Sequence, residues 1–221
     1  DDVWLSEGFA TYFTLMFREY AYGREDFVEG LKQARDRVFN YYEKDKKASI
    51  IHNNLSDMKK VLTYDLQYQK GAWVLHMLRN YIGDDFFREG IRNYYSKYFN
   101  SNATTEQFKI EMEKVSNKDL DIFFDQWLYK GGNIILDGDW TYNKNKKQIV
   151  INLKQNQNDG YYFDMPLEVE IFYENKILTK LHEIKIQEGS YNYIISSDEE
   201  PKNIILDPKT KLLARWNFLK K

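Results

Sequence analysis

Hydrophobic positions in the first 130 residues recur with the spacing of amphipathic helices. From Trp4 onward, apolar residues fall three and four positions apart, which places them on one face of a helix that ends near Gly23. Residues 47–64 lack a regular period and indicate a loop with short helical turns. The same spacing predicts three further helices, which run from about residue 25 into the 40s, over 69–82 and over 84–98.

Two capping signals predict more helices before residue 131. In Thr104-Thr105-Glu106-Gln107, a threonine oxygen can accept the third helical amide while Gln107 folds back onto the cap. Ser116 and Asp119 repeat this logic ahead of another apolar run. Gly131-Gly132-Asn133 then ends the helical part.

After these glycines the hydrophobic period changes to two, as in half-buried strands. The alternating positions are Ile149, Ile151 and Leu153, then Leu167, Val169, Ile171 and Tyr173, then Ile184 and Ile186. Turn signals separate them at 143–145, 158–160, 174–176, 188–189 and Pro201. The pattern predicts a small antiparallel β-sandwich after a boundary near residue 134. The expected fold class is therefore α+β, with an all-helical part over 1–133 and the sandwich over 134–221.

Composition narrows the class of protein. The 221 residues are 43% hydrophobic and 30% charged, which is typical of a globular chain and excludes a disordered or collagenous one. The net charge of -2 argues against a dedicated nucleic-acid binder and against a polybasic membrane address. Without cysteine there is no disulfide, thiolate nucleophile or cysteine zinc finger. No apolar run approaches the roughly 18 residues of a membrane-spanning helix.

Two positions are candidates for chemistry. Glu7 lies in Trp4-Leu5-Ser6-Glu7-Gly8-Phe9-Ala10-Thr11-Tyr12, one turn into an apolar helix and beside a glycine where a large ion could approach the backbone. Spacing alone favours the simpler interpretation, a solvent-facing anion near a helix N-terminus. Tyr68, at the start of a buried helix, could donate to a developing oxyanion or could be a packed core tyrosine.

Other catalytic schemes lack their residues. The sequence has no Gly-x-Ser-x-Gly and no phosphate-binding glycine motif. Its histidines, His52, His76 and His182, form no His-x-x-x-His pair, so no familiar spacing encodes a complete zinc site. His76 shares a helix face with Trp73 and Met77, which is typical of a hydrogen-bonded core histidine.

The two candidate motifs together resemble a known family. Trp-Leu-Ser-Glu-Gly-Phe-Ala-Thr-Tyr, followed about 60 residues later by Tyr-Gln-Lys-Gly-Ala-Trp-Val-Leu-His-Met-Leu-Arg, is similar to the aminopeptidase N and leukotriene hydrolase family of zinc metallopeptidases, the gluzincin aminopeptidases. The similarity continues through Phe123-Phe124-Asp125-Gln126-Trp127-Leu128 and down to Ile205-Leu206-Asp207-Pro208. It implies the helical half of a thermolysin-like catalytic domain followed by the family's sandwich.

The resemblance assigns roles to both candidates. It implies that Glu7 is the third zinc ligand and that Tyr68 hydrogen-bonds the oxyanion of the tetrahedral intermediate. In the family's His2Glu site the zinc ion keeps one position open for the attacking water. The two histidines and the general-base glutamate belong to a His-Glu-x-x-His helix that would precede Asp1. The sequence therefore represents, on this resemblance, the second half of an active site, and we expect it neither to hold zinc tightly nor to cleave peptides alone.

Two functions remain in consideration. The first is part of a zinc aminopeptidase that removes N-terminal residues from peptides and whose missing N-terminal part completes the site. The second is a non-catalytic scaffold or peptide-binding module that keeps the fold. The presence of both Glu7 and Tyr68 favours the enzyme. An absent upstream helix would leave apolar surface exposed over residues 4–22, so we expect self-association through that face. The sequence assigns no cellular compartment.

Overall fold

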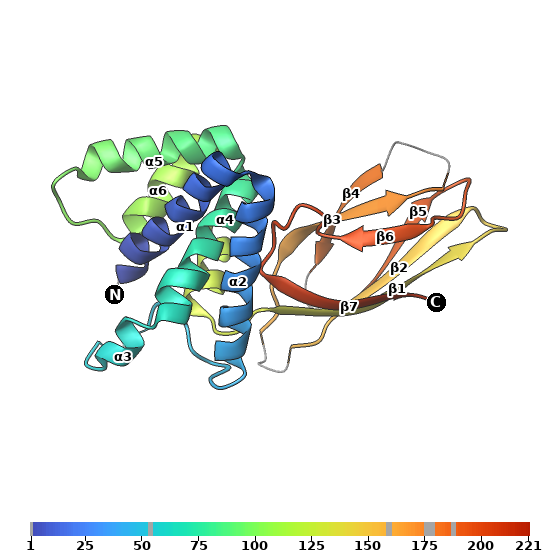
Figure 1. The fold of residues 1–221 in the computed structure, drawn as a ribbon, viewed down its shortest axis with the longest axis horizontal. Helices are drawn as coiled ribbons and strands as arrows, with labels where there is room; N and C mark the ends of the chain where they lie inside the picture. Colours follow the sequence, from blue (N-terminus) through green and yellow to red (C-terminus); the bar gives the residue numbers. More distant parts are fainter. Residues whose placement is uncertain (1, 53–54, 158–160, 175–179, 187–188) are drawn as a thin grey trace. The chain divides into compact units, whose positions relative to one another are not determined.

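The chain folds into two compact units, Asp1–Gly132 and Asn133–Lys221. The structure, a computed structural model, describes residues 2–52, 55–157, 161–174, 180–186 and 189–221. The first unit is helical and the second consists of β-strands (Figure 1). This arrangement confirms the expected order of a helical part followed by a small β domain.

The helices begin and end close to where the hydrophobic spacing predicts them. The α-helices are α1 (Val3–Tyr22), α2 (Arg24–Tyr42), α3 (Met58–Val61), α4 (Gly71–Ile82), α5 (Asp84–Tyr98), α6 (Thr105–Ser116) and α7 (Asp121–Phe124). Two further segments are π-helices, η1 (Tyr64–Lys70) and η2 (Asp125–Tyr129). The expected α-helix from residue 69 is therefore only partly correct, because its first two residues belong to η1. Within the described residues, no helix has both the length and the apolar character needed to cross a membrane.

The capping signals differ in outcome. Thr104 and Gln107 form the predicted capping box of α6, since the Thr104 hydroxyl accepts from the amide of Gln107 and the Gln107 side chain accepts from the amide of Thr104. The N-cap of α7 is Leu120, without a side-chain cap, so Asp119 is not the predicted cap; it accepts from the amide of Asp121 (2.9 Å) in the turn before the helix. Ser116 is not a cap: it is the last residue of α6, and its hydroxyl donates to the Met112 carbonyl (2.7 Å).

The first turn of α1 is anchored to the start of α6. Trp4, which is fully buried, donates from Nε1 to the Thr105 hydroxyl (2.8 Å). Asp2 Oδ1 accepts from the amide of Thr105 (2.8 Å) and from its hydroxyl (2.6 Å). Because each buried polar group has a partner, these contacts fix the direction of α1 at little cost in desolvation.

The strands of the second unit form two sheets. Their bounds are β1 (Ile134–Asn143), β2 (Gln148–Gln155), β3 (Met165–Phe172), β4 (Lys180–Ile186), β5 (Ser190–Ser196), β6 (Asn203–Leu206) and β7 (Ala214–Lys220). One sheet has the order β5-β2-β1-β7 and the other β4-β3-β6. Side chains of β2 and β3 alternate between buried and partly exposed, as the period of two predicts. The turn signals at 158–160, 175–176 and 188 lie outside the described residues.

One strand pairing differs from the expected antiparallel sandwich. β7 runs parallel to β1, with Ile134 opposite Ala214. The chain leaves the second sheet after β6 and crosses to the first before β7, so no hairpin forces an antiparallel pairing there. Asp207 stabilises this crossing, because its carboxylate accepts from the amides of Lys211 (2.8 Å) and Leu212 (3.0 Å). Burial raises the pKa of Asp207 to about 6, against the opposing effect of these two hydrogen bonds.

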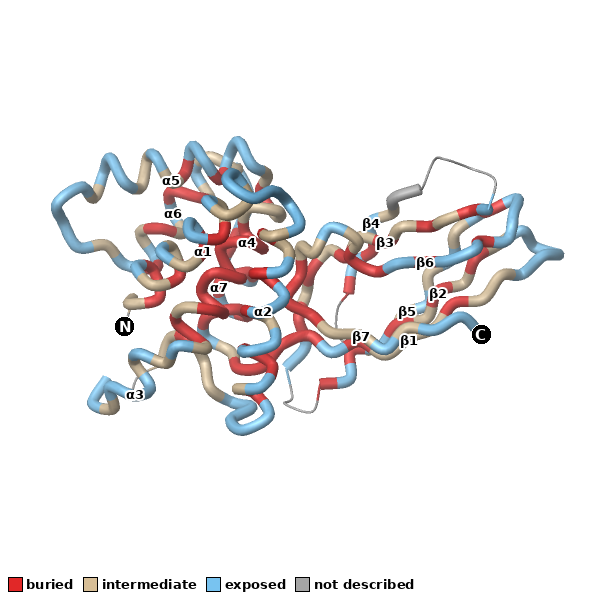
Figure 2. Tube along the Cα trace, in the orientation of Figure 1, coloured by how far each residue is buried: buried red, intermediate tan, exposed pale blue. Residues whose placement is uncertain are grey.

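In the helical unit, α1 crosses the junction of η1 and α4 at two glycines. A Cβ atom on Gly8 would lie 3.0 Å from the carbonyl carbon of Gly71, and one on Gly71 would lie 3.2 Å from the Gly8 Cα. A side chain on either glycine would therefore require the facing backbone to shift by a few tenths of an ångström. α4 is buried along most of its length (Figure 2), so α1 rests against the best-packed part of the unit.

We predict that Gly8→Ala lowers the free energy of unfolding by about 1 to 2 kcal/mol. Overpacking against backbone costs about 1 to 3 kcal/mol, and the better helix propensity of alanine offsets up to about 1 kcal/mol of it. Chemical denaturation measures the change. Ala10→Ser is the matched control, because it adds one atom to an exposed position of the same helix and should change stability by about 0.5 kcal/mol or less. Equal effects of the two substitutions would show that the crossing tolerates a side chain.

Candidate functional site

The π-helix η1 presents Tyr68 on the less buried side of its last turn. The neighbouring residues Leu66, Gln67, Gln69 and Lys70 are all buried, whereas Tyr68 is partly exposed. A π-helical turn accommodates an extra residue compared with an α-helical turn, and such turns are frequent at functional sites. Tyr68 is therefore not the packed core tyrosine of the simpler interpretation.

The glycine crossing brings Glu7 and Tyr68 together from positions far apart in the sequence. Glu7 immediately precedes Gly8 on α1, and Tyr68 lies three residues before Gly71. The expectation that the Gly8 backbone is open to a large ion is wrong, because Gly8 is buried and the Gly71 backbone covers it. The glycine instead permits the close approach of two helices.

The Tyr68 hydroxyl lies near enough to the Glu7 carboxylate for the two groups to interact. The pKa of Tyr68 is raised, first by burial of the hydroxyl and then by the hydrogen bond and negative charge of Glu7. A tyrosine with a raised pKa stays protonated at neutral pH. Tyr68 therefore remains a hydrogen-bond donor, directed at the one carboxylate that the sequence identified as a metal-ligand candidate.

His76 takes no part in this group. It is 2% exposed, and its Nδ1 lies 3.0 Å from the Tyr12 hydroxyl. Arg79 also contacts that hydroxyl (3.4 Å) and forms a two-bonded ion pair with Asp84 (2.8 and 2.7 Å). Burial raises the pKa of Tyr12 to about 12, so it too stays protonated. His76 is the core histidine that the sequence predicted.

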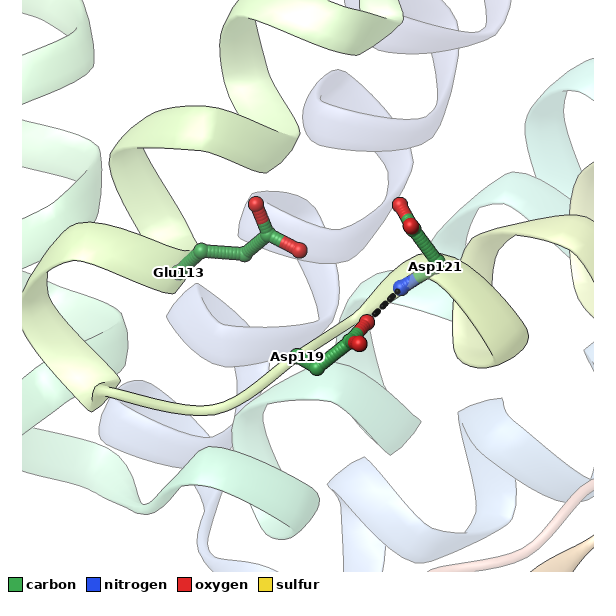
Figure 3. A group of neighbouring side chains, drawn as sticks. All are labelled: Glu113, Asp119 and Asp121. Carbon is green, nitrogen blue, oxygen red and sulfur yellow. Dashed lines mark hydrogen bonds between the residues drawn. The ribbon is translucent and has the colours of Figure 1, made fainter.

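An acidic cluster lies elsewhere in the helical unit. Figure 3 shows Glu113, Asp119 and Asp121, which place carboxylate oxygens within 4.8 Å of one another. Each carboxylate has a structural partner: Glu113 accepts from the amide of Leu120 (2.9 Å), Asp119 accepts from the amide of Asp121 (2.9 Å), and Asp121 is paired with the Lys109 ammonium. These contacts explain the cluster without a metal ion.

An apolar cleft lies along the N-terminal half of α1. Its volume is about 610 Å³, and its apolar lining from α1 and α5 includes Phe9, Phe13, Ile91 and Tyr94. On the exposed side of α1, Phe13 and Phe17 are 43% and 61% exposed. A helix facing water usually carries charged residues at such positions. This side of α1 is therefore of the kind that packs against another protein segment.

Sequence reasoning missed two residues that support the site. Lys70 is fully buried and Gln67 is 2% exposed, and both belong to the same π-helix as Tyr68. A lysine and a glutamine are ordinarily exposed, and their burial here follows from partners distant in the sequence. The sequence signal that could have identified them is the run of polar residues immediately before the apolar helix α4.

Comparisons with known proteins give a consistent set of relatives. Residues 1–127 match the peptidase family M1 domain. The chain is 29% identical over 177 residues to glutamyl aminopeptidase of Bos taurus and 26% identical over 175 residues to aminopeptidase N of Lactococcus lactis subsp. lactis. Each alignment covers 76% of this chain, but only 18% and 20% of the respective relative. The chain thus spans about one fifth of the length of these relatives.

A solved structure has a similar fold. The crystal structure of Legionella pneumophila aminopeptidase A in complex with aspartic acid superposes with a TM-score of 0.73 at 17% sequence identity. The superposition covers 98% of this chain and 24% of the other. The similarity therefore extends over both units of the chain.

Proposed function

The chain belongs to peptidase family M1, and from that premise we propose that it supplies part of the active site of a zinc aminopeptidase. In this proposal Glu7 is a zinc ligand and Tyr68 stabilises the oxyanion formed when a peptide bond is attacked. The observation that carries the proposal is the close approach of Gly8 and Gly71, which brings the Glu7 carboxylate near the Tyr68 hydroxyl. It joins the two motifs that the sequence separates by about 60 residues.

Glu7 fits the role of one metal ligand. Its side chain is partly exposed, and among the residues that the structure describes no lysine, arginine or histidine forms an ion pair with it. Carboxylate oxygens are among the ordinary ligands of zinc. A complete site needs further donors, and His76 is engaged with Tyr12. We therefore propose that two histidines and a general-base glutamate come from outside these 221 residues.

Tyr68 supplies the electrostatic part of the mechanism. The chemistry that zinc contributes in a His2Glu site is polarisation of the peptide carbonyl and activation of water. Glu7 lies on α1, and this helix cannot shift without separating Gly8 from Gly71. The Tyr68 hydroxyl, kept protonated by its raised pKa, donates a hydrogen bond to the negative oxygen that develops on the substrate. Such a donor contributes most in the transition state, where the charge is greatest.

The exposed apolar face of α1 has a role in the same proposal. Phe13 and Phe17 project from the helix that carries Glu7, and the apolar cleft opens beside its first turns. We propose that the part of the protein that supplies the remaining ligands packs on this face. Burial of this surface would then hold both halves of the site together.

A longer protein from the same gene that includes the proposed histidine segment tests the proposed roles of Glu7 and Tyr68. We expect one bound zinc ion and hydrolysis of an alanyl or leucyl arylamide. Glu7→Ala should remove the metal together with activity. Tyr68→Phe should retain the metal and lower kcat by about 100-fold, the usual effect of losing one oxyanion donor. Zinc content by elemental analysis and steady-state kinetics measure both.

The matched control is Glu19→Gln, which changes a carboxylate on the same helix that pairs with Arg24 (2.9 Å) instead. It should change neither zinc content nor kcat. A longer protein that lacks zinc and activity would support the scaffold function. Normal zinc content in Glu7→Ala would remove Glu7 from the ligand set.

The 221-residue chain by itself tests the proposed division of the site and the proposed exposed interface. With one ligand present and the α1 face uncovered, we expect no stoichiometric zinc, no arylamide hydrolysis and an average mass that rises with protein concentration. Sedimentation equilibrium measures the mass, and Phe13→Glu together with Phe17→Glu should abolish the concentration dependence. A concentration-independent monomer would contradict the proposed exposed interface, and zinc-dependent hydrolysis would contradict the proposed division of the site.

A further inference from the structure

Lys70 is a fully buried lysine, with 0% of its surface exposed, two residues after Tyr68 in the same π-helix. Burying an ammonium group is costly unless hydrogen bonds replace its hydration. A lysine is therefore rarely retained in a core without a specific purpose. Its contacts show what it holds in place.

The three N–H bonds of the Lys70 ammonium have three acceptors. Nζ donates to the Tyr42 hydroxyl (2.7 Å) and to the carbonyl oxygens of Lys130 (3.4 Å) and Gly132 (3.3 Å). It also lies 4.9 Å from the centre of the Tyr42 ring, within the range of a cation–π contact. Lys70 thereby joins η1 to the end of α2 and to the segment that follows η2.

Gln67 ties the same π-helix to a different part of the unit. Its Oε1 accepts from the amide of Thr63 (2.9 Å), and its Nε2 donates to the Ile50 carbonyl (2.9 Å). Tyr68 lies between Gln67 and Lys70 in the sequence and is the partly exposed residue of the three. Buried hydrogen bonds on both sides of Tyr68 therefore hold the backbone that carries it.

We propose that Lys70 is a positioning residue for Tyr68: its three hydrogen bonds keep η1 in π-helical form and so hold the Tyr68 hydroxyl toward Glu7. The π-helix closes its hydrogen bonds five residues apart and the α-helix four residues apart. If η1 relaxed to an α-helix, each side chain ahead of Gly71 would rotate about the helix axis. Tyr68 would then lose its alignment with Glu7. This inference rests on the proposed function of Tyr68.

The experiment is a double-mutant cycle in the full-length protein with bound zinc. Lys70→Met keeps the length of the side chain and removes its three donors. We expect kcat to fall about 10- to 100-fold, as for a misplaced catalytic group, with KM and zinc content changed less than about twofold. In a Tyr68→Phe background, Lys70→Met should lower kcat less than about twofold further, because the group that it positions is already absent. Lys32→Met, at an exposed position of α2, is the control and should leave kcat unchanged.

The cycle separates positioning from general destabilisation. An equal loss of kcat from Lys70→Met with and without the Tyr68 hydroxyl would overturn the proposal. If Lys70→Met does not fold, Tyr42→Phe removes one acceptor of the ammonium and should give a smaller loss that also disappears in the Tyr68→Phe background.

A failure of the proposed function would be recognised separately, because either the full-length protein would be inactive or Tyr68→Phe alone would leave kcat unchanged. In that case, the positioning role of Lys70 is tested by measuring the pKa of Tyr68 by NMR with ¹³Cζ-labelled tyrosine. A lower pKa of Tyr68 in Lys70→Met, toward that of an exposed tyrosine, would support positioning, and an unchanged pKa would contradict it.

Discussion

The contact between the backbones of Gly8 and Gly71 is the constraint on which the candidate site depends. It sets how closely α1 approaches the junction of η1 and α4, and hence whether Glu7 can reach Tyr68. A side chain at either glycine would push the two backbones apart at this contact. The two motifs recognisable in the sequence therefore form the two sides of one helix crossing. Glu7, the proposed metal ligand, lies one residue before that crossing on α1.

The environment of the crossing explains why a π-helix persists there. A π-helical turn is rare and needs tertiary contacts to favour it over the α-helix. Gln67 and Lys70 provide such contacts through buried hydrogen bonds, and Trp4 fixes the opposite helix through Thr105. Polar groups inside this unit thus position elements where apolar packing alone would leave their rotation less defined.

The sequence predicted the elements better than their junctions. Apolar spacing located the long helices, the period of two located the strands, and the Thr104 capping box was correct because all three signals are local. The π-helical form of η1 and the burial of Lys70 depend on residues such as Tyr42 and Gly132, which are distant in sequence. The parallel course of β7 likewise depends on a crossing between sheets. For Gly8 the sequence predicts the close approach of an ion, whereas the structure places the Gly71 backbone there, because no local pattern reveals which helix packs on a glycine.

The most direct test of this account is the titration of Tyr68 in the 221-residue chain, observed by NMR with ¹³Cζ-labelled tyrosine and assigned with Tyr68→Phe. If the glycine crossing brings the two side chains together, Glu7→Gln removes a negative charge and a charged acceptor, and the pKa of Tyr68 falls, while burial keeps it above that of a free tyrosine. Glu19→Gln, farther along the same helix, should leave it unchanged. An identical pKa of Tyr68 in the wild-type chain and in Glu7→Gln would contradict the central claim that these residues form one site.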